Sequence, residues 1–473
     1  MPRASNRPRQ RASRACDFCH ARGLRCRRPT SESGTTLPGC LTCVDYGVKC
    51  TQDRPAGKRG RKPKSLIVEV LSDVSSPQPV DHFSLQTVRR LTRIYRDTMY
   101  QCYFPFLPEK DLSTRWEDSI PSPEEPSYIV LMALCAVSAH TAELEAVFDD
   151  SLLEGSPLPD SHIYFEEAVS RLSPSFPQDF DYLRVFGLLT VYALQCGDNR
   201  NLHHYLGRYH ALVAEYGFHD ESRWPSNISL AEVDDRRRLF WCAYRLEIHS
   251  ACVFGHIIRM PEAQVSVFYP RTTPMMDAET QTWTVGWDYI TDLFRLLEYA
   301  MFGLRACKTR KAILAIFCDR PSLTMLLDSL ARLKSSKSHT LNDLKHPERG
   351  FNSKRCNYMA VQISCTETLV TIMALLYCQA PAREVMEVAE SFLQELTAAP
   401  LIMFKVAGSQ IVHQLLGVGH MLSNASQYDN GQYRSEARRL IIFLADLVKN
   451  LKDVIPAAAA AGDRLLILAQ ATS

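Results

Sequence analysis

The chain has 473 residues, of which 46% are apolar and 22% charged, a balance that is typical of folded proteins and excludes disorder over the whole length. At roughly 150 residues per domain, this length predicts about three folding units. We find no apolar run near the roughly 18 residues that a membrane span needs, so we expect no membrane partner.

The net charge of +2 is the sum of two opposed parts. Residues 1–64 carry 16 basic and 4 acidic residues, a net charge of +12, whereas the remaining 409 residues carry 38 basic and 48 acidic ones, a net charge of −10. This asymmetry indicates that the N-terminal segment meets a polyanion and that the acidic body has another role.

Three short segments precede the body. Residues 1–15 form a basic arm, rich in Arg, Ser and Pro, which we expect to be disordered by itself. Residues 16–50 are punctuated by cysteines, and residues 51–82 form a basic linker. The apolar patch at 66–74 covers barely one heptad before Pro77, which is too short for a coiled coil.

From about Leu85 onward the apolar residues recur at three- and four-residue steps, as in Val88, Leu91, Tyr95 and Met99. Patterns of alternating residues, typical of strands, are nearly absent, so we expect a mostly all-α chain with a large helical body. Further helical patterns cover residues 128–148, 181–196, 202–216, 287–305, 311–317, 357–378, 384–397, 408–422 and 434–451.

Local signals mark particular helix ends. Gly217 follows an apolar stripe and is typical of a helix end. Ser229, with Glu232 three residues later, predicts a capped helix start. Asp234 and Arg238, four residues apart on that helix, predict an ion pair. The polar stretch at 332–355 predicts a loop.

Six of the 16 cysteines lie in two copies of the pattern Cys-x2-Cys-x6-Cys: Cys16, Cys19, Cys26, Cys40, Cys43 and Cys50. The first 14 residues lack the apolar segment of a secretion signal, so we expect metal ligands rather than disulfides. One tetrahedral zinc takes four thiolates, and six can serve two zinc ions if two sulfurs are shared. The duplicated spacing therefore predicts two zinc ions per chain. The other ten cysteines, which have apolar neighbours, are expected to be core thiols.

The block closely resembles the fungal zinc binuclear cluster (Zn2Cys6) transcription factors, in the segments CDFCHARGLRC and CLTCVDYGVKC and in Pro38. The resemblance implies that Cys16 and Cys40 bridge the two zinc ions. Cys19 and Cys26 would complete one zinc site, and Cys43 and Cys50 the other. It also implies that a first short helix enters the major groove of double-stranded DNA and reads a CGG-like triplet.

The reading positions of that helix fall on Arg22 and Gly23 in this sequence. Arg22 can donate two hydrogen bonds to a guanine, a contact worth about 1–3 kcal/mol of discrimination. Gly23 stands where the family usually has a basic residue and has no side chain for a base contact, so we expect a half-site that departs from the standard one. The remaining expected contacts are to phosphates, which position the protein without reading sequence; they are Arg14, His20, Arg25, Arg27 and Arg28.

A basic run in the linker has two functional interpretations; its charged residues are Lys58, Arg59, Arg61, Lys62 and Lys64. A dense basic run is typical of a nuclear localisation signal. The Arg-Gly-Arg core also resembles an AT-hook, whose extended arm inserts arginine into a narrow minor groove. The third interpretation is an inert linker.

The body carries a second, looser resemblance to the same fungal family. The run RRRLFWCAYRLE at 236–247, with the later segments 254–256 and 260–270, resembles the family's middle homology region over roughly 90–310. It implies an all-helical regulatory region at 83–310, continued by a C-terminal helical part at 311–473, and sometimes a small effector. Phe240, Trp241 and Tyr244 in this run are expected to be core residues.

No catalytic signature appears: the sequence contains no GxSxG, HExxH or Walker motif, and His203, His204 and His210 have no Cys or carboxylate near them to complete a site. We therefore expect a nuclear, sequence-specific regulator of RNA polymerase II genes, controlling a metabolic or biosynthetic gene set, and not an enzyme. Two alternatives remain, a zinc-dependent protein-interaction module fused to a ligand-sensing domain and an enzymatic body with a DNA-binding appendage. The chain either binds as a monomer or forms a homodimer through the helical body.

Overall fold

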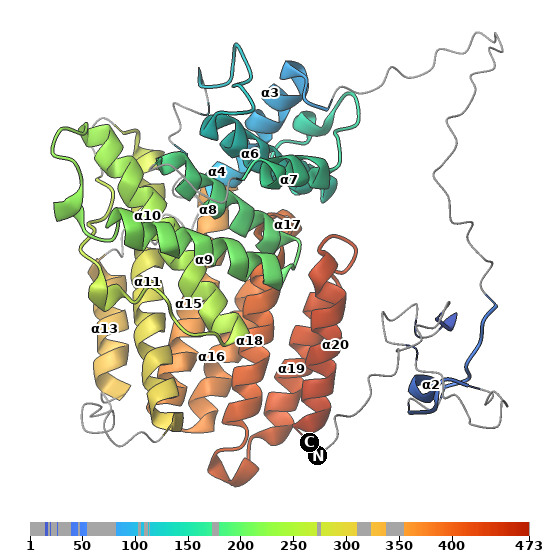
Figure 1. Cartoon of the computed structure of the whole chain (residues 1–473). Coiled ribbons are helices and arrows are strands. Elements are labelled where there is room, and N and C mark those ends of the chain that lie inside the picture. The colour runs from blue at the N-terminus through green and yellow to red at the C-terminus, as the bar shows by residue number, and fades with distance from the viewer. Residues whose placement is uncertain are drawn as a thin grey trace, which may run out of the picture. The chain divides into compact units, whose positions relative to one another are not determined.

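The computed structural model describes residues 15–17, 19, 26, 39–45, 48–53, 82–102, 106–107, 112, 114–172, 179–271, 276–309, 323–336 and 354–472. The chain divides into two compact units, Met1–Pro77 and Gln78–Ser473. Figure 1 shows the helices of both units, and each unit is described by itself.

The first unit contains one helix with assigned bounds, α2 (Leu41–Asp45), which begins directly after Cys40. The amide of Val44 donates to the carbonyl of Cys40 at 3.2 Å and closes the first turn. Sulfur-bearing side chains make up the described interior of this unit, with Cys16, Cys19, Cys40 and Cys43 buried and Ala15, Cys26 and Cys50 packed against them. A segment of this size cannot build a hydrocarbon core large enough to fold alone, so the thiol cluster stands in its place.

The second unit is helical, as the sequence predicts, and its described residues contain only an isolated bridge between Asp220 and Ser266 in place of a sheet. Its α-helices are α3 (Leu85–Ile94), α4 (Tyr100–Cys102), α6 (Pro126–Glu143), α7 (Ser161–Ser170), α8 (Phe180–Gln195), α9 (Asn199–Tyr216), α10 (Leu230–Phe254), α11 (Ala278–Thr309), α13 (Leu323–Ser336), α15 (Lys354–Tyr377), α16 (Ala382–Thr397), α17 (Leu401–Ala407), α18 (Ser409–Ala425), α19 (Arg434–Lys449) and α20 (Pro456–Ala471). A π-helical turn, η1 (Tyr95–Met99), joins α3 to α4, and single 3-10 turns lie at η2 (Asp150–Leu153), η3 (Glu221–Arg223), η4 (Glu262–Gln264) and η5 (Asp429–Gly431).

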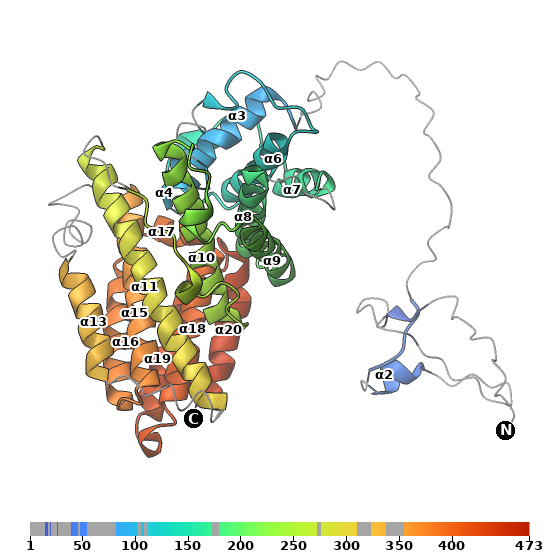
Figure 2. The ribbon, with the colours of Figure 1, turned by 60° about the vertical axis from the view of Figure 1, so that its left-hand side comes forward.

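The helices of the second unit form two groups. Helices α11, α15, α16, α18, α19 and α20 run roughly side by side as a bundle, with α13 at its edge, and α3, α6, α7 and α8 gather at one end of this bundle (Figures 1 and 2). Within the groups, α11 packs on α15, α19 on α20 and α6 on both α7 and α8. Helix α10 contacts α8, α9, α11 and α18, so it links the two groups.

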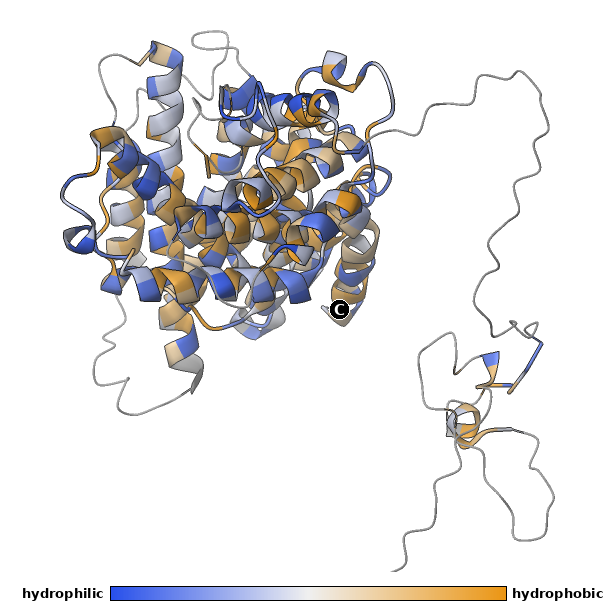
Figure 3. Ribbon diagram, turned by 45° about the horizontal axis from the view of Figure 1, so that its top comes forward, coloured by the Kyte–Doolittle hydropathy of each residue, from blue (hydrophilic) through white to orange (hydrophobic). Residues whose placement is uncertain are grey.

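One continuous apolar core runs through this unit from α3 to α20. Its largest fully buried side chains are aromatic and include Tyr164, Tyr209, Tyr244, Tyr289, Tyr358, Phe106, Phe186, Phe218, Phe240 and Phe294. Figure 3 shows hydrophobic residues along the inner helices and hydrophilic ones along the outer faces. Removal of this apolar surface from water is the main force that holds the unit together.

The predicted signals at helix ends are confirmed. The Ser229 hydroxyl accepts a hydrogen bond from the amide of Glu232 at 3.2 Å, and α10 starts at the next residue. Glu232 turns its carboxylate to Arg236 at 2.6 Å. Gly217 ends α9 in the left-handed region with φ 61°, a conformation that glycine adopts at little cost.

The predicted pairing of Asp234 with Arg238 is wrong. The Asp234 carboxylate lies 3.3 Å from Arg237, three residues along α10, and 3.2 Å from Arg271, which follows that helix. Asp234 therefore has a local partner three residues away and a tertiary partner beyond the helix. The neighbouring Asp235 pairs instead with Arg184 of α8.

Several element boundaries differ from the predicted ones. Helix α6 ends at Glu143, and the buried Phe148 lies in the connection that follows. The loop predicted at 332–355 is wrong at both ends, because residues up to Ser336 complete α13 and Lys354 begins α15. The predicted helix at 311–317 lies outside the described residues. Sequence patterns missed α7, α13, α17 and α20.

The scattered cysteines mostly occupy the core, as expected. Cys102, Cys135, Cys242, Cys356 and Cys365 are buried, and Cys252 and Cys378 are partly buried. Cys196 is exposed because it caps the end of α8 rather than facing the interior. The side chains of Cys307 and Cys318 lie outside the described part of the chain.

Helix α15 is long and apolar enough to cross a membrane, and the bent pair α17 and α18 passes the same test when taken together. However, 67% of the apolar window in α15 is buried within the unit, where the helix packs on α11, α16 and α18. This burial is that of a core helix in a helical bundle.

Candidate metal centre

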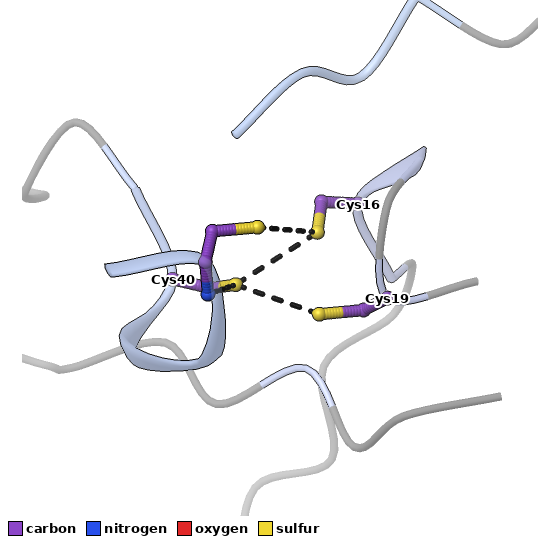
Figure 4. A group of neighbouring side chains, drawn as sticks. Cys16, Cys19 and Cys40 are labelled. Carbon is purple, nitrogen blue, oxygen red and sulfur yellow. Dashed lines mark hydrogen bonds between the residues drawn. The ribbon is translucent and has the colours of Figure 1, made fainter. Parts of the chain in front are cut away.

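Four cysteines meet at one point of the first unit. The Sγ atoms of Cys16, Cys19, Cys40 and Cys43 all lie within 4.8 Å of one another, and all four residues are buried. Cys16 lies next to Cys40 at 3.8 Å and next to Cys43 at 3.6 Å, and Cys19 lies 3.7 Å from Cys40. Figure 4 shows Cys16 and Cys19 turned toward Cys40 across the gap between two chain segments.

These separations fit a metal site and exclude disulfides between these sulfurs. A disulfide bond is about 2.05 Å long, and all four cysteines are free thiols. At a Zn–S distance of about 2.3 Å, two corners of a sulfur tetrahedron lie about 3.8 Å apart. The three separations of 3.6–3.8 Å match this spacing, and all four sulfurs lie within 4.8 Å of one another, so the group can hold a metal ion.

Two of the cysteines are central to the cluster. The thiol of Cys16 interacts with the side chains of Cys19, Cys40 and Cys43, and that of Cys40 interacts with Cys16, Cys19 and Cys43. Cys19 interacts with these two central thiols, and Cys43 with the same two and with Cys50. Each of the two central thiols therefore interacts with all three of the other buried cysteines.

The remaining two predicted ligands lie at the edge. Cys26 and Cys50 are partly buried and pack against the four central residues. The amide of Cys40 points to the sulfur of Cys50 at 3.5 Å, and the amide of Cys43 points to that of Cys40 at 3.4 Å. Amides directed at sulfur stabilise negative charge on it.

The thiols differ in acidity because they share one small space. Burial opposes ionisation of Cys16, but hydrogen bonds from the Cys19 backbone and from neighbouring thiols lower the pKa of Cys16 to about 6. Burial and the neighbouring sulfurs raise the pKa of Cys19 to about 12 and also raise that of Cys43. Several thiolates can coexist at these distances only with a cation among them.

A backbone clasp that sequence reasoning missed closes the block. The Asp17 carboxylate accepts hydrogen bonds from the Thr51 hydroxyl at 2.9 Å and from the Asp53 amide at 2.7 Å. The Asp17 amide in turn donates to the Thr51 carbonyl at 3.0 Å. The segment after Cys50 is thereby tied to the segment after Cys16, and no spacing pattern signals that contact.

Comparison with known proteins assigns the body of the chain to a protein family. A family model described as "Fungal specific transcription factor domain" matches residues 92–355, more than half of the chain. The chain belongs to this family. The match lies within the helical unit, of which it covers the first two thirds, and does not include the cysteine block.

A curated relative of this fungal family member agrees with that assignment. The "Maltose fermentation regulatory protein MAL33" of Saccharomyces cerevisiae is 23% identical over 277 residues, which are 53% of this chain and 54% of the relative. The chain thus spans about half the length of the curated relative that it matches. Both comparisons support a regulator of transcription.

Helix α10 carries the RRRLFWCAYRLE run inside the matched region of this transcription factor domain. Phe240, Trp241 and Tyr244 are buried, as expected. The Trp241 ring nitrogen donates to the carbonyl of Phe268 at 3.0 Å, and the Tyr244 hydroxyl donates to Glu298 at 2.6 Å. The run therefore fastens neighbouring segments to the core.

The histidines of α9 have partners that the sequence did not indicate. His210 lies 3.0 Å from the carboxylate of Glu247, which comes from α10, and the His203 ring lies against that of His256 with centroids 4.8 Å apart. Glu247 also receives the guanidinium of Arg259 at 2.7 Å. Glu247 and its partners His210 and Arg259 therefore form one ion-pair network, in which each side chain helps to position the others.

The predicted DNA contacts all lie outside the described residues and stay predictions: Arg14, His20, Arg22, Gly23, Arg25, Arg27 and Arg28. The same holds for the basic run of the linker, Lys58, Arg59, Arg61, Lys62 and Lys64. Of the predicted site residues, the structure brings together the cysteines alone.

Proposed function

We propose that this transcription regulator binds DNA sequence-specifically through a cluster of two zinc ions held by the six cysteines of residues 16–50. Cys16, Cys19, Cys26 and Cys40 hold one ion, and Cys43 and Cys50 complete the second site with the shared sulfurs of Cys16 and Cys40. The observation that carries the proposal is the buried group of four sulfurs, three pairs of which lie 3.6–3.8 Å apart.

The contacts of Cys16 and Cys40 support this division of ligands. In a bridged cluster each shared sulfur neighbours the terminal ligands of both sites, and each terminal ligand neighbours both shared sulfurs. Cys16 and Cys40 meet the first condition, and Cys19 and Cys43 meet the second. When bound, two zinc ions supply the positive charge that six thiolates in one small space require.

The metal count tests the cluster directly. Native mass spectrometry of the purified chain should give two zinc ions per chain. Cys40→Ser should retain fewer than one, because Cys40 belongs to both sites. Cys196→Ser removes an exposed thiol of the helical unit and should keep both ions. A wild-type chain without zinc, or a Cys40→Ser chain that keeps two ions, would contradict the proposal.

DNA recognition is assigned to the residues between the first and third cysteines. Arg22 reads a guanine, and the surrounding basic residues bind phosphates. Arg22→Ala should relax the preference at one base pair by about 1–3 kcal/mol while leaving the zinc content at two. Fluorescence anisotropy with a set of duplexes that differ at single positions measures this. Equal preference profiles for wild type and variant would remove Arg22 from base reading.

The setting of this activity is the nucleus, and the basic run at 58–64 acts in import. The name of the yeast relative places that protein in maltose fermentation; for this chain we propose control of a metabolic or biosynthetic gene set. Arg59→Ala combined with Arg61→Ala should reduce nuclear accumulation of a fluorescent fusion. If the double variant instead stays nuclear and loses affinity for sites with A·T-rich flanks, the run is a minor-groove arm.

A further inference from the structure

The helical unit contains a pocket of about 410 Å³ between α11, α15 and α18, beside the end of α10. Figures 1 and 2 show α10 ending against this part of the bundle. The apolar part of the pocket consists of Met301, Leu304, Met373, Leu376 and Met421. A pocket of this size and lining is typical of small-molecule sites, which range over roughly 300–1,000 Å³.

Arg305 is the one charged residue among the described residues that line this pocket. The guanidinium of Arg305 donates through Nη1 to the carbonyl of His256 and through Nη2 to that of Ala251, both at 2.6 Å. These bonds use two of its five N–H groups. Burial lowers the pKa of Arg305, an effect that the nearby Cys252 opposes.

Arg305 differs from three ion-pairing arginines of this unit. Arg184, Arg237 and Arg259 each pair with at least one carboxylate. Within the described residues, the recorded partners of Arg305 are backbone carbonyls, and none of the residues lining the pocket is acidic. A half-buried guanidinium without a carboxylate beside an apolar cavity is a site that an anion would stabilise.

The three methionines of the pocket favour an apolar ligand of irregular shape or one with an aromatic ring. Their unbranched thioether side chains adapt to varied shapes and make favourable contacts with aromatic rings. Asn424, Gln427 and Tyr428 lie on the same pocket and supply polar groups at its border.

We propose that this pocket binds a small amphipathic carboxylate, with the acid on Arg305 and an aromatic or aliphatic portion against Met301, Met373 and Met421. The site lies wholly within the second unit and does not depend on the zinc proposal. Because Arg305 also holds the carbonyl end of α10, the bound anion joins α10 to α11 at a common point.

Two probes of nearly equal size separate charge from apolar contact. Isothermal titration calorimetry of the full chain should show that 1-naphthylacetate binds at least about tenfold more tightly than the neutral 1-naphthylacetamide, since hydrogen bonds to charged groups contribute most. Arg305→Gln should abolish this preference, and Arg305→Lys should retain part of it. Arg383→Gln is the matched control, because Arg383 pairs with Glu387 on the exposed face of α16.

Filling the pocket tests its location. Met373→Trp should weaken binding of both probes by at least about tenfold, because the larger ring occupies the apolar space. Circular dichroism and the thermal midpoint show that each variant is folded. The proposal is overturned if neither probe binds at millimolar concentration, if folded Met373→Trp binds as wild type does, or if folded Arg305→Gln keeps the preference for the carboxylate.

Discussion

At the scale of single residues, Glu247 is a buried carboxylate whose stability depends on its hydrogen-bond and ion-pair partners. Its side chain is fully buried, and its carboxylate accepts from the Arg259 backbone amide and guanidinium, both at 2.7 Å, and lies 3.0 Å from His210. Burial alone would raise the pKa of Glu247, but hydrogen bonding and attraction from His210 and Arg259 lower it to about 2. The carboxylate is thus stable only as part of this group.

Removing the charge of Glu247 should destabilise the fold. Glu247→Gln leaves the partly buried Arg259 without its anion, and breaking a fully buried pair costs about 3–5 kcal/mol, which is an upper bound here. We expect a clear fall of the thermal midpoint in differential scanning calorimetry. Glu387→Gln is the matched control, since it breaks an exposed pair with Arg383 and should change little. Equal midpoints for the two variants would contradict the argument.

The ionisation of Glu247 also makes the stability of the helical unit depend on pH. The pKa of Glu247 in the folded state, about 2, lies below its ordinary value of 4.5, so its stabilisation is complete above about 4.5 and is lost as the pH falls toward 2. Because glutamine does not titrate, the difference in midpoint between wild type and Glu247→Gln should shrink as the pH falls through this range. A difference that stays constant there would show that Glu247 keeps an ordinary pKa.

At the scale of elements, close approach between helices and their neighbours depends on particular glycines. A Cβ atom on Gly187 of α8 would lie 2.5 Å from the ring of Phe106, which is fully buried. A Cβ atom on Gly417 of α18 would have no neighbour within 4 Å. The two positions are both inside helices, so they separate the effect of packing from that of helix propensity.

Replacing glycine by alanine should change the stability of the unit in opposite directions at the two positions. Gly187→Ala should destabilise the unit by about 1–3 kcal/mol through overpacking. Gly417→Ala should stabilise it by up to about 1 kcal/mol, because alanine is the better helix former. Thermal midpoints measured side by side check both signs. A stabilising Gly187→Ala would mean that the Phe106 ring moves aside at no cost.

Sequence patterns predicted most of the long helices, but they missed α13 and α20 as well as the shorter α7 and α17. The start of α10 was predictable because Ser229 and Glu232 form a local signal, and the end of α9 because Gly217 does. The contact of Asp234 with Arg271 was not predictable, because Arg271 lies beyond the helix and reaches it only through the fold. Helix α17 has seven residues, too few to show a period.

At the scale of the whole molecule, charge is divided along the chain. The first 64 residues carry 16 basic and 4 acidic groups, whereas the rest of the chain is acidic overall. Because an acidic body repels a polyanion, the proposed function assigns DNA binding to the basic segment. The proposed function therefore predicts a strong effect of salt.

Affinity for DNA should fall by about a thousandfold between roughly 50 and 200 mM salt if about six phosphates are contacted, because bound counterions are released. The combined change of Arg27→Ala and Arg28→Ala should reduce the salt slope by about two while leaving the base preference unchanged. Anisotropy titrations at several salt concentrations measure the slope. A flat response would favour the alternative in which the cysteine block binds protein.

For the candidate site, spacing alone pointed to the six cysteines, because metal ligands must recur at intervals that fit one coordination shell. The clasp formed by Asp17 with Thr51 and Asp53 was not predictable. Its members lie 34 and 36 residues apart, and one of its donors is a backbone amide, which leaves no trace in a sequence.

That clasp has a mechanical consequence for a protein made of two units. Three hydrogen bonds join the chain just after Cys16 to the chain just after Cys50. A pull transmitted along the backbone from the larger unit arrives at Asp53 and is borne first by the carboxylate of Asp17. These hydrogen bonds therefore take up such a force before it reaches the cysteine cluster.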